Sequence, residues 1–590
     1  MNNKLLGENN RPCCYDLELS QLTLRRRRSR QSLCTMHGRL KIKTTAEQAA
    51  EKQKEREEKR KLYLGGLTKA FDKRSTGTYD EEGLKVTAQL LMANPDAATL
   101  WNFRREIILA MKSDDHESWD KLLQGELSVV ENCLMKNHKS YGAWHHRCWV
   151  MENFPNPPWD KELALCDKYL KADERNFHCW DYRRFVVARS SKQPEDELKT
   201  SQQLIERNLS NYSAWHYRSK LLPLVYPPLP DTPHPVPENT LIKELQTVVE
   251  AVFTDPSDQS PWFFLRWLVN RQEKNPRLLQ TGFISSGTKD SLLVCVFSKP
   301  LMQQNIPQIS VDDEDVGNNE WHAPDNETYS YVWVVQLKEL SEGEHSIAIS
   351  FNSSTKKSLT VSPGKTSVAW MTELEEELTG LTRSTLEEVK QNCITLDELD
   401  PGNKWVLLTI VDVMWALDSY SHQAKISSYL SQLQDLDPLR TKYYADMKSK
   451  LSMETALKKH RLTTENDDQF KLNERRLTRI AYSHLLACSK SVDLSCNELS
   501  SIQPLKSLVA CKELLLDDNQ IADVTPLVFL KKLEKLSLSK NKIDSLDQLK
   551  PLQEILTLKE LTLSSNNICN IENIDEQVKE FLPQVQRVIW

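Results

Sequence analysis

The stretch Asn137-His-Lys-Ser-Tyr-Gly-Ala-Trp144-His-His-Arg147 recurs along the first half of the chain and decides its fold. Five tryptophans follow one another at intervals of 35 to 47 residues, each with Asn or Asp seven residues before it and Arg three or four residues after it. A repeat of this length is typical of stacked hairpins of two helices. The five sets are Asn94, Trp101 and Arg104; Asn137, Trp144 and Arg147; Asp173, Trp180 and Arg183; Asn208, Trp215 and Arg218; and Asp255, Trp262 and Arg266.

The repeated residues are those expected of a structural framework. Trp and Arg three residues apart share one face of a helix, so the Trp is expected to fill the seam between hairpins. The Arg is expected to reach carboxylates or helix-end carbonyls, and the Asn or Asp to cap or precede the helix. A weaker copy at Asp400-Pro-Gly-Asn-Lys-Trp405, with Leu408 in place of the arginine, indicates that the helical array continues further along the chain.

A change of pattern at residue 278 predicts an insert in the helical array. Short alternating apolar runs such as 291–297 and 329–337, separated by turn residues, are typical of strands. We therefore predict an immunoglobulin-like β-sandwich over 278–365. The flanking predictions are a first helical part over 36–277 and a second helical part over 366–466.

The last segment carries a different repeat, L-x-L-x-x-N, with asparagines at 497, 519, 541 and 566. Spacings of 22, 22 and 25 residues predict a leucine-rich repeat domain over 467–590, whose concave strand face is a potential partner surface. Such repeats are modular, so we expect this domain to have its own core and its deletion to leave the rest intact. The predicted fold is thus multidomain and mainly α: a helical-hairpin solenoid interrupted by a β-sandwich and followed by leucine-rich repeats.

Composition narrows the class of protein. The chain is 39% apolar and 27% charged, and it has no apolar run long enough for a membrane span or a signal peptide, so we expect a cytoplasmic protein. Thirteen cysteines without a C-x-x-C pair indicate neither a disulfide framework nor a zinc knuckle. The net charge is −6, and it argues against general binding of nucleic acid.

The N-terminal segment 1–35 differs from the rest, because it carries +4 and leaves −10 for the remaining residues. We predict a disordered basic extension there, with Met36 as a second plausible start. The arginine run 25–28 leaves open a targeting or nuclear-import patch.

The sequence contains few signs of self-contained catalysis. A Gly-rich phosphate loop, a G-x-S-x-G elbow and an H-E-x-x-H pair are all missing, which disfavours a hydrolase, kinase or dehydrogenase. His145 and Cys148 lie three residues apart on a predicted helix and could share a metal, with His178 and Cys179 one repeat later. Two ligands do not make a site, so packing between hairpins is the favoured interpretation.

The repeats around Trp144, Trp180 and Trp215 resemble those of the protein prenyltransferase α subunits, and this resemblance covers about 94–267. A β-sandwich insert followed by a leucine-rich domain resembles the α subunits of the Rab, or type II, geranylgeranyltransferases. With these additions the resemblance covers nearly all of Met36–Trp590.

The resemblance implies one half of an enzyme. Its partners would be a barrel-shaped β subunit that holds geranylgeranyl diphosphate and a zinc ion, an escort protein, and the Rab GTPases whose C-terminal cysteines receive the lipid. The zinc cofactor would be bound by the β subunit, with no metal on this chain. The chain alone would have neither zinc nor transferase activity.

The resemblance also assigns roles to residues of the second repeat. Lys139 matches the α-subunit lysine that approaches the diphosphate, so it would be catalytic by stabilising the leaving group. Without the resemblance, a lysine near a helix start would be interpreted as solvated. Tyr141 would bind substrate at the same subunit border, or would pack beside Trp144. Phe177 stands where farnesyltransferase-like relatives have Tyr, so a hydroxyl contact at that point cannot be transferred.

A scaffold without chemistry is the alternative hypothesis, in which helical and leucine-rich repeats only hold partners. Lys139 distinguishes the two hypotheses in sequence. Co-purification of a smaller, zinc-containing subunit distinguishes them in the laboratory.

Overall fold

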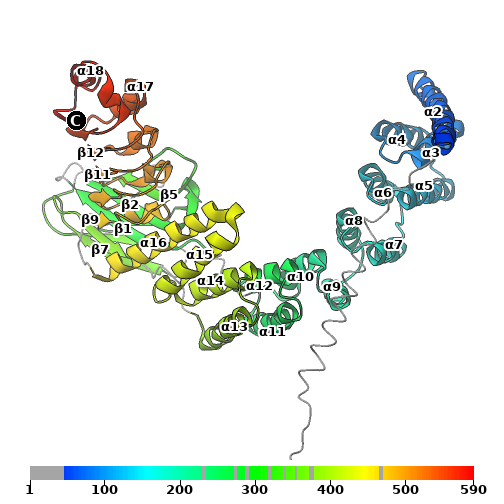
Figure 1. Ribbon diagram of the computed structural model, residues 1–590, viewed down its shortest axis with the longest axis horizontal. Helices are drawn as coiled ribbons and strands as arrows, with labels where there is room; N and C mark the ends of the chain where they lie inside the picture. The colour runs from blue at the N-terminus through cyan, green and yellow to red at the C-terminus, as the bar shows by residue number, and fades with distance from the viewer. Residues whose placement is uncertain are drawn as a thin grey trace, which may run out of the picture. The chain divides into compact units, whose positions relative to one another are not determined.

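The structure is a computed structural model that describes residues 46–228, 234–270, 275–285, 291–306, 308–316, 321–337, 340–351, 355–370, 378–463 and 469–590. The predicted N-terminal extension 1–35, with its arginine run, lies outside the described residues. The chain is mainly helical, with helical repeats followed by a region that contains sheets (Figure 1). It divides into two compact units, Met1–Ser190 and Ser191–Trp590.

The first unit consists of helical hairpins stacked in sequence order behind a long first helix (Figure 1). Its helices are α2 (Ala46–Ser75), α3 (Glu81–Ala93), α4 (Ala98–Ala110), α5 (His116–Lys136), α6 (Tyr141–Asn153), α7 (Trp159–Ala172) and α8 (Phe177–Val187).

The helical part of the second unit continues the same pattern of hairpins. Its helices are α9 (Pro194–Arg207), α10 (Tyr212–Val225), α11 (Glu238–Thr254), α12 (Gln259–Val269), α13 (Gly380–Leu399), α14 (Lys404–Asp418), α15 (Gln423–Leu436) and α16 (Thr441–Thr463). One-turn 3₁₀ helices cover Gln303–Asn305 (η1) and Pro438–Arg440 (η3).

The repeated Asn or Asp ends the first helix of each hairpin and precedes the second helix, as one of the two predicted alternatives had it, but it does not cap the second helix. In all five hairpins its side-chain oxygen accepts the backbone N–H two residues later, at 3.0–3.3 Å. This is an Asx turn, which the short polar side chain forms without help from the rest of the protein. Other residues, such as Ser140 and Asn176, cap the second helices.

Each repeated tryptophan stabilises this turn. The Trp is the fourth residue of its helix, and its indole N–H donates to the carbonyl six residues earlier, at 2.8–3.0 Å. All five side chains are at most 4% exposed. The hydrogen bond satisfies the one polar atom that an otherwise apolar ring brings into the core.

The turn carbonyl also joins neighbouring hairpins. The Pro95 carbonyl accepts a second hydrogen bond from Ser140 Oγ at 2.9 Å, and the His138 carbonyl accepts one from Asn176 Nδ2 at 2.9 Å. In the second unit the Pro256 carbonyl does the same with Asn403 Nδ2 at 2.9 Å. The residue that caps one helix thereby aligns its hairpin with the preceding one.

The repeated arginines form ion pairs with acidic residues of neighbouring helices. The pairs are Arg104 with Glu126 (2.5 Å), Arg147 with Glu162 (2.6 and 2.7 Å), Arg183 with Asp167 (2.6 Å), Arg218 with Glu244 (2.6 and 2.7 Å) and Arg266 with Asp412. Guanidinium groups suit these sites because they remain charged when buried and bind carboxylates through two N–H groups.

The weaker repeat keeps the turn but changes the core residues. Asp400 ends α13, and position seven after it is the buried Leu407 instead of Trp. The arginine position is therefore Ile410, so the prediction of Leu408 there is wrong by two residues. Trp405 lies earlier in α14 and packs against Phe263, with ring centroids 5.3 Å apart.

The predicted insert consists of two four-stranded antiparallel sheets with a common core that includes Phe283, Phe297 and Trp333. One sheet has the order β5-β2-β1-β8 and the other β4-β3-β6-β7. The strands are β1 (Leu278–Ser285), β2 (Ser291–Met302), β3 (Gln308–Val311), β4 (Glu314–Val316), β5 (Tyr329–Gln336), β6 (His345–Phe351), β7 (Thr355–Val361) and β8 (Ser367–Trp370). Because β8 pairs with β1, the insert extends past the predicted end at 365, and the next described helix begins at Gly380.

The C-terminal region is a six-stranded parallel sheet, β9 to β14, in which successive strands pair in sequence order. The strands are β9 (Gln469–Lys471), β10 (Ser491–Asp493), β11 (Glu513–Leu515), β12 (Lys535–Ser537), β13 (Glu560–Thr562) and β14 (Arg587–Ile589). Short helices connect them: η4 (Ser483–Leu486), η5 (Gln503–Ser507), η6 (Thr525–Phe529), α17 (Leu546–Leu549), η7 (Lys550–Glu554), η8 (Asn567–Asn570) and α18 (Ile574–Phe581).

The repeated asparagines of this region are buried and bind backbone groups. Asn519, for example, donates to the carbonyls of Leu494 and Leu516 at 3.1 and 3.0 Å and accepts the N–H of Leu499 at 3.0 Å. Each asparagine thus bonds its own coil and the preceding one.

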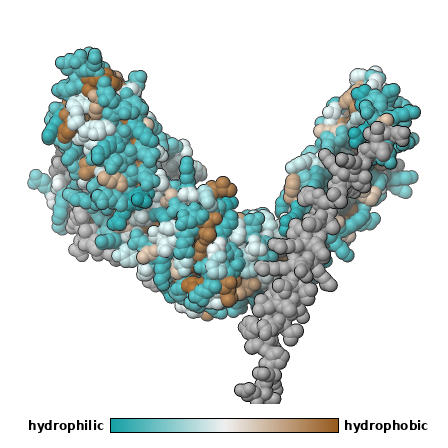
Figure 2. Space-filling view, viewed as in Figure 1, coloured by the Kyte–Doolittle hydropathy of each residue, from teal (hydrophilic) through white to brown (hydrophobic). Residues whose placement is uncertain are grey.

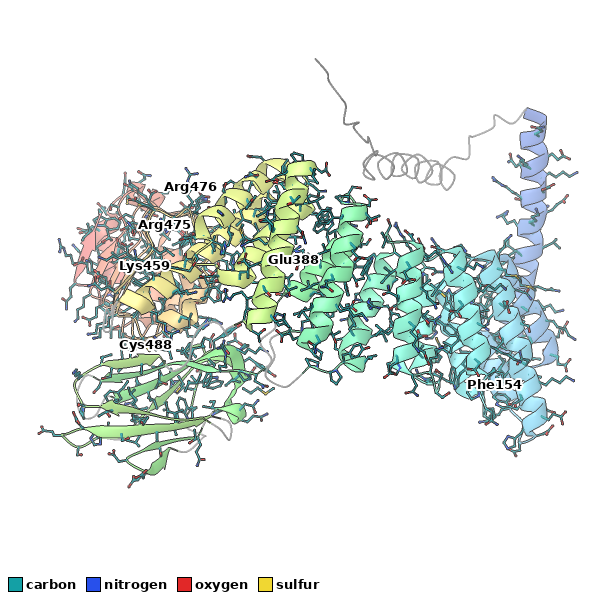
Figure 3. All side chains as sticks on the ribbon, turned by 90° about the horizontal axis from the view of Figure 1, so that it is seen from below. Phe154, Glu388, Lys459, Arg475, Arg476 and Cys488 are labelled. Carbon is teal, nitrogen blue, oxygen red and sulfur yellow. The ribbon has the colours of Figure 1, made fainter. Side chains whose placement is uncertain are left out.

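The core of the C-terminal sheet consists mostly of its own residues but is continuous with neighbouring elements, so it is less separate than expected. A single apolar cluster joins it to the outer face of β1, β2 and β5 and to α16, through residues such as Val294, Val332 and Met453. Gly282 lies so close that a Cβ there would be 2.2 Å from Cys488 Sγ. Figure 3 shows Cys488 at this boundary between the sheets.

The hydropathy of the surface differs between parts of the molecule. On the face drawn in Figure 2, a strip of apolar residues crosses the helices of the second unit, in an otherwise largely hydrophilic surface. Among the described residues, no helix combines the length and the apolar character needed to cross a bilayer.

The buried pair of Arg104 and Glu126 predicts a pH-dependent stability. Burial alone would raise the pKa of the Glu126 carboxyl, but Arg104 and the hydrogen bond from His146 lower it from 4.5 to about 2. The stabilisation of the folded state by the ionised Glu126 carboxylate is therefore complete above pH 4.5, and it is lost as the pH falls through about 2. Glu126→Gln should lower the stability of the first unit by roughly 3–5 kcal/mol at neutral pH, because Arg104 stays buried without its partner.

Calorimetric unfolding of the full chain between pH 2 and pH 7 measures both effects. The control is Glu131→Gln, which removes the exposed pair with Lys168 and should cost less than about 1 kcal/mol. Equal losses in the two variants would contradict the role given to burial.

The shared core predicts that deletion of 467–590 is not tolerated. It would expose the outward valines of β2 and β5, and the truncated chain should bind hydrophobic dyes and self-associate in size-exclusion chromatography. A truncated chain that also carries Val294→Ser, Val296→Ser and Val332→Ser should associate less. A monomeric truncated chain with unchanged helical stability would show instead that the C-terminal sheet is modular.

Candidate functional site

The turn before α6 is fixed at three points. The Asn137 side chain accepts the N–H of Lys139 at 3.1 Å, and the His138 carbonyl accepts both Trp144 Nε1 and Asn176 Nδ2 at 2.9 Å. Ser140 then caps α6 and donates to the preceding hairpin. The backbone of Lys139 is therefore held firmly, while its side chain is 58% exposed.

The Lys139 ammonium has one anionic neighbour. Its Nζ lies 3.2 Å from Asp173 Oδ2, and His138 Nε2 lies 3.5 Å from the same oxygen. Asp173 is the turn residue of the next hairpin, and its other oxygen accepts the N–H of Arg175. An exposed pair of this kind contributes at most about 1 kcal/mol, so a more highly charged anion can replace the carboxylate.

Two aromatic side chains lie beside this lysine. Tyr141, which is 70% exposed, packs edge-on against the ring of His178 with centroids 4.2 Å apart, and Phe177 lies 6.1 Å away. Burial lowers the pKa of His178, and the charge of Lys139 lowers it further against the opposite effect of Asp181. A neutral His178 therefore supports an exposed aromatic face next to a cation.

The other candidate ligands are engaged elsewhere. His145 Nδ1 lies 2.8 Å from Arg105, and burial raises the pKa of the Cys148 thiol to about 11. Cys179 is buried and donates to the Cys166 carbonyl. Within the described ranges, no three His, Cys, Asp or Glu residues come together as a metal site.

The sequence indicated Tyr141 and Phe177 separately, but not that both belong to one aromatic repeat position, three residues before the Trp. Tyr141 and Phe177 occupy it in the first unit, and Tyr212 occupies it in the second. In the second unit Tyr212 lies 5.9 Å from Phe263, which in turn contacts Trp405. Exposed aromatic residues at one fixed repeat position are the sequence signal that would have indicated a contact surface.

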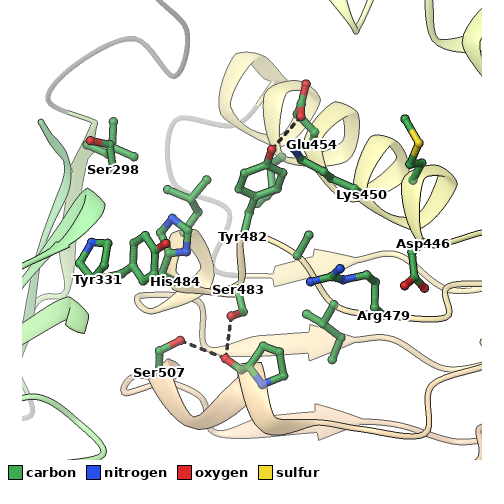
Figure 4. A pocket seen from close by; sticks show the side chains of 18 of the residues that line it. Ser298, Tyr331, Asp446, Lys450, Glu454, Arg479, Tyr482, Ser483, His484 and Ser507 are labelled. Atoms are coloured by element: carbon green, nitrogen blue, oxygen red, sulfur yellow. Dashed lines mark hydrogen bonds between the residues drawn. The ribbon is translucent and has the colours of Figure 1, made fainter. Parts of the chain in front are cut away.

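A second feature, also missed, is a cleft of about 1470 Å³ in the second unit (Figure 4). Its walls come from α12, α14, α16, the β5-β2-β1-β8 sheet and the first turns of the C-terminal region. No local motif connects segments so far apart in the chain.

Comparisons with known proteins place this arrangement in a class. The sequence pattern described as the protein prenyltransferase alpha subunit repeat matches residues 80–111, 123–154, 159–190, 194–224 and 241–272. Each of these segments contains one of the five tryptophans. The helical repeats are therefore those of prenyltransferase α subunits.

Whole-chain relatives are more specific. The geranylgeranyl transferase type-2 subunit alpha of Rattus norvegicus is 38% identical over 572 residues, which span 94% of this chain and 100% of the relative. The protein of the same name from Homo sapiens is 38% identical over 573 residues with the same coverage. A solved structure, Candida albicans protein geranylgeranyltransferase-I complexed with GGPP, aligns with 66% of this chain and 90% of that chain, at 15% identity and a TM-score of 0.38. The chain belongs to the geranylgeranyl transferase type-2 α-subunit family.

Gly142 predicts how sensitive this site is to packing. A Cβ at Gly142 would lie 2.7 Å from Trp101 Cδ1 and 3.2 Å from the Pro95 carbonyl, so Gly142→Ala must shift the start of α6. We expect a loss of about 1–3 kcal/mol in unfolding free energy, because the added methyl group overpacks the seam.

Gly125→Ala is the matched control, since Gly125 lies within α5 with nothing within 4 Å of the added Cβ. It should stabilise the chain by up to about 1 kcal/mol. Thermal unfolding of both variants measures the difference. A neutral Gly142→Ala would show that α6 does not depend on this close approach.

Proposed function

We propose that this chain is the α subunit of a heterodimeric enzyme that transfers geranylgeranyl from geranylgeranyl diphosphate to C-terminal cysteines of Rab GTPases presented by an escort protein. The observation that carries the proposal is 38% identity over the full length of geranylgeranyl transferase type-2 α subunits. The β subunit would form the barrel that holds the lipid, and the complex would work in the cytoplasm.

Lys139 is the residue of this chain to which we assign a catalytic role. The hydrogen-bonded turn holds its backbone in place. The exposed ammonium pairs with the Asp173 carboxylate, and only this weak ion pair must break when the diphosphate binds. Negative charge grows on the diphosphate as its bond to C1 of the lipid breaks. A cation at that position stabilises the transition state more than the ground state.

Tyr141 is assigned to substrate binding at the same subunit border. Its exposed ring lies two residues from Lys139 and is supported by His178. Phe177 adds an apolar surface without a hydroxyl group, so it is suited to lipid or to the β subunit and not to a phosphate oxygen. The repeated Trp and Arg residues have no assigned chemistry, because they are engaged in the framework.

Zinc is assigned to the β subunit. The described residues of this chain offer no ligand set, and the candidate cysteines Cys148 and Cys179 are held as protonated or buried thiols. When bound by the partner, zinc would lower the pKa of the acceptor cysteine and present it as a thiolate. This chain would contribute the cation near the leaving group and the surface that positions the two subunits.

The finer domain assignments belong to the same proposal. The two facing antiparallel sheets support an immunoglobulin-like β-sandwich, and the parallel sheet with its asparagine turns supports a leucine-rich repeat domain. We set the sandwich at 278–370 and the leucine-rich repeats at 467–590, with helical parts on either side of the sandwich.

The scaffold alternative is tested by Lys139→Ala in the purified heterodimer. Losing one charged contact to a developing anion typically costs about 100-fold, and less when the site is wet and shared with other cations. We expect single-turnover lipid transfer to fall roughly 10-fold or more, with a smaller change in affinity for the lipid diphosphate. Lys139→Arg should recover part of the rate.

Two variants serve as controls for this measurement. Lys136→Ala removes an exposed lysine three residues away, at the end of α5, and should leave the rate unchanged. Asp173→Asn removes the partner charge but keeps a residue that forms the same turn in three other hairpins, so transfer should persist. An unchanged rate in Lys139→Ala, with the heterodimer intact, would return the chain to the scaffold hypothesis.

A further inference from the structure

The cleft of the second unit lies where its three parts meet (Figure 4). Helix α16 forms one side with Lys450 and Glu454, strand β5 contributes Tyr331, and the segment after β9 contributes Arg479 and Tyr482. A space of about 1470 Å³ is large enough for several residues of a peptide.

The walls of this cleft are fixed relative to one another. The apolar cluster that joins the sheets to α16 runs directly behind them. On the open side, Thr478 Oγ1 donates to Asp446 Oδ1 at 2.7 Å, and the Thr478 N–H donates to Ser449 Oγ at 2.9 Å. The segment that carries Arg479 is therefore bound to α16 at two points.

Part of the wall is aromatic and accessible. Tyr331, which is 40% exposed, stacks on His484 with centroids 4.5 Å apart, and Tyr482 lies next to His484. Trp415 and Tyr443 extend the surface along α14 and α16. Burial lowers the pKa of His484 to about 4, so this aromatic surface is uncharged at neutral pH.

The carboxylates that line the cleft all have partners already. Glu454 accepts Trp415 Nε1 at 3.0 Å, Ser419 Oγ at 2.5 Å and Tyr482 OH at 3.0 Å. Asp412 pairs with Arg266, and Asp446 accepts a hydrogen bond from Thr478. Asp325 pairs with Lys506 and accepts the backbone N–H of Glu327.

Two cations of the lining differ from the others. Arg266, Lys458 and Lys506 each pair with a carboxylate, whereas Lys450 and Arg479 make no hydrogen bond or ion pair to any described residue. Lys450 lies over the rings of Trp415 and Tyr482, at 5.4 and 5.6 Å. The cleft thus has two exposed positive charges that form no ion pair, beside an aromatic wall, although the charge of Lys450 also acts on the partly buried Asp412.

The surface next to the cleft increases this positive charge. Within 441–463 and 469–479 the chain has ten Lys or Arg against three Asp or Glu, although its net charge is −6. Arg475 and Arg476 are exposed and lie beside α16, with Lys459 nearby (Figure 3). Burial lowers the pKa of Lys448, and the charge of Arg476 lowers it further, although Asp435 opposes the effect.

We propose that this cleft binds an acidic segment of a partner protein, with carboxylates on Lys450 and Arg479 and an aromatic or apolar side chain against Tyr331, Tyr482 and Trp415. A guanidinium group can bind one carboxylate through two N–H groups, and an ammonium can bind a second. The proposal does not depend on the catalytic role of Lys139, because the cleft lies in a different unit of the chain.

The shape of the site favours a peptide over other anions. A membrane surface is flat and would reach exposed basic residues, but not an aromatic wall recessed between a sheet and a helix. Nucleic acid is disfavoured by the four carboxylates in the lining and by Glu513, Glu534 and Glu560 of the C-terminal region, which lie on or just before strands β11, β12 and β13.

Selection from a random dodecapeptide library displayed on phage tests the proposal with the full chain. The selected pool is compared on the unmodified chain, on Lys450→Gln/Arg479→Gln, and on Lys531→Gln/Lys540→Gln as a control with the same charge change on the exposed C-terminal surface. We expect a class of peptides rich in Asp, Glu and aromatic residues whose affinity falls at least tenfold in the first variant and is unchanged in the control.

Two results would overturn the proposal. In the first, no selected peptide distinguishes the two double variants, or the peptides that do are not acidic. In the second, vesicles containing phosphatidylserine bind the chain through Lys450 and Arg479 while no peptide does, which would assign the surface to a membrane. Because both residues are exposed, their substitution should leave thermal unfolding unchanged, and calorimetry of the same samples checks this.

Discussion

The hydrogen bond from each repeated indole to the turn carbonyl six residues earlier is the interaction on which the helical region depends. It fixes the angle between the two helices of a hairpin at the point where an Asx turn has already ended the first helix. At Pro95, His138 and Pro256 the same carbonyl also accepts a bond from the cap of the next hairpin, so there one oxygen sets both the fold within a repeat and the alignment between repeats. Regular stacking follows from a local arrangement repeated five times.

This framework separates buried structural residues from the exposed residues for which we propose a role. The arginine of each repeat points into the seam and is consumed by a carboxylate, whereas Lys139 stands on the outside of a turn whose backbone cannot move. A cation on a well-held backbone, with an exposed side chain in a single ion pair, can meet a charged substrate at little conformational cost. Tyr141 gains the same advantage from its position at the first residue of α6. Family membership motivates the role that we propose for Lys139, and its fixed turn and exposed side chain are compatible with that role.

Sequence reasoning reached the hairpins because their determinants lie within a dozen residues of one another. The helices around Trp144 and the parallel strands around Asn519 could be predicted from spacing alone. Contacts between distant segments could not: β8 joins its sheet by pairing with β1, some ninety residues earlier, and Val294 shares a core with Val492. The cleft around Lys450 combines residues from helices of the second unit, the β5-β2-β1-β8 sheet and the C-terminal region for the same reason. At the candidate site the sequence indicated Lys139 and Tyr141, but neither Asp173 nor the support from His178.

The contact of Gly282 with Cys488 has a consequence for the synthesis of the chain. The outer face of β1 and β2 is complete soon after residue 302 emerges from the ribosome, but the α16 and C-terminal side chains that cover it, from Met453 to Cys488 and beyond, are made much later. At about 5–20 residues per second, a valine-rich sheet face remains uncovered for roughly 10 to 40 s. During this interval the nascent chain presents the kind of surface that chaperones recognise. The order of the segments along the chain therefore sets the interval during synthesis in which this apolar sheet face can associate incorrectly.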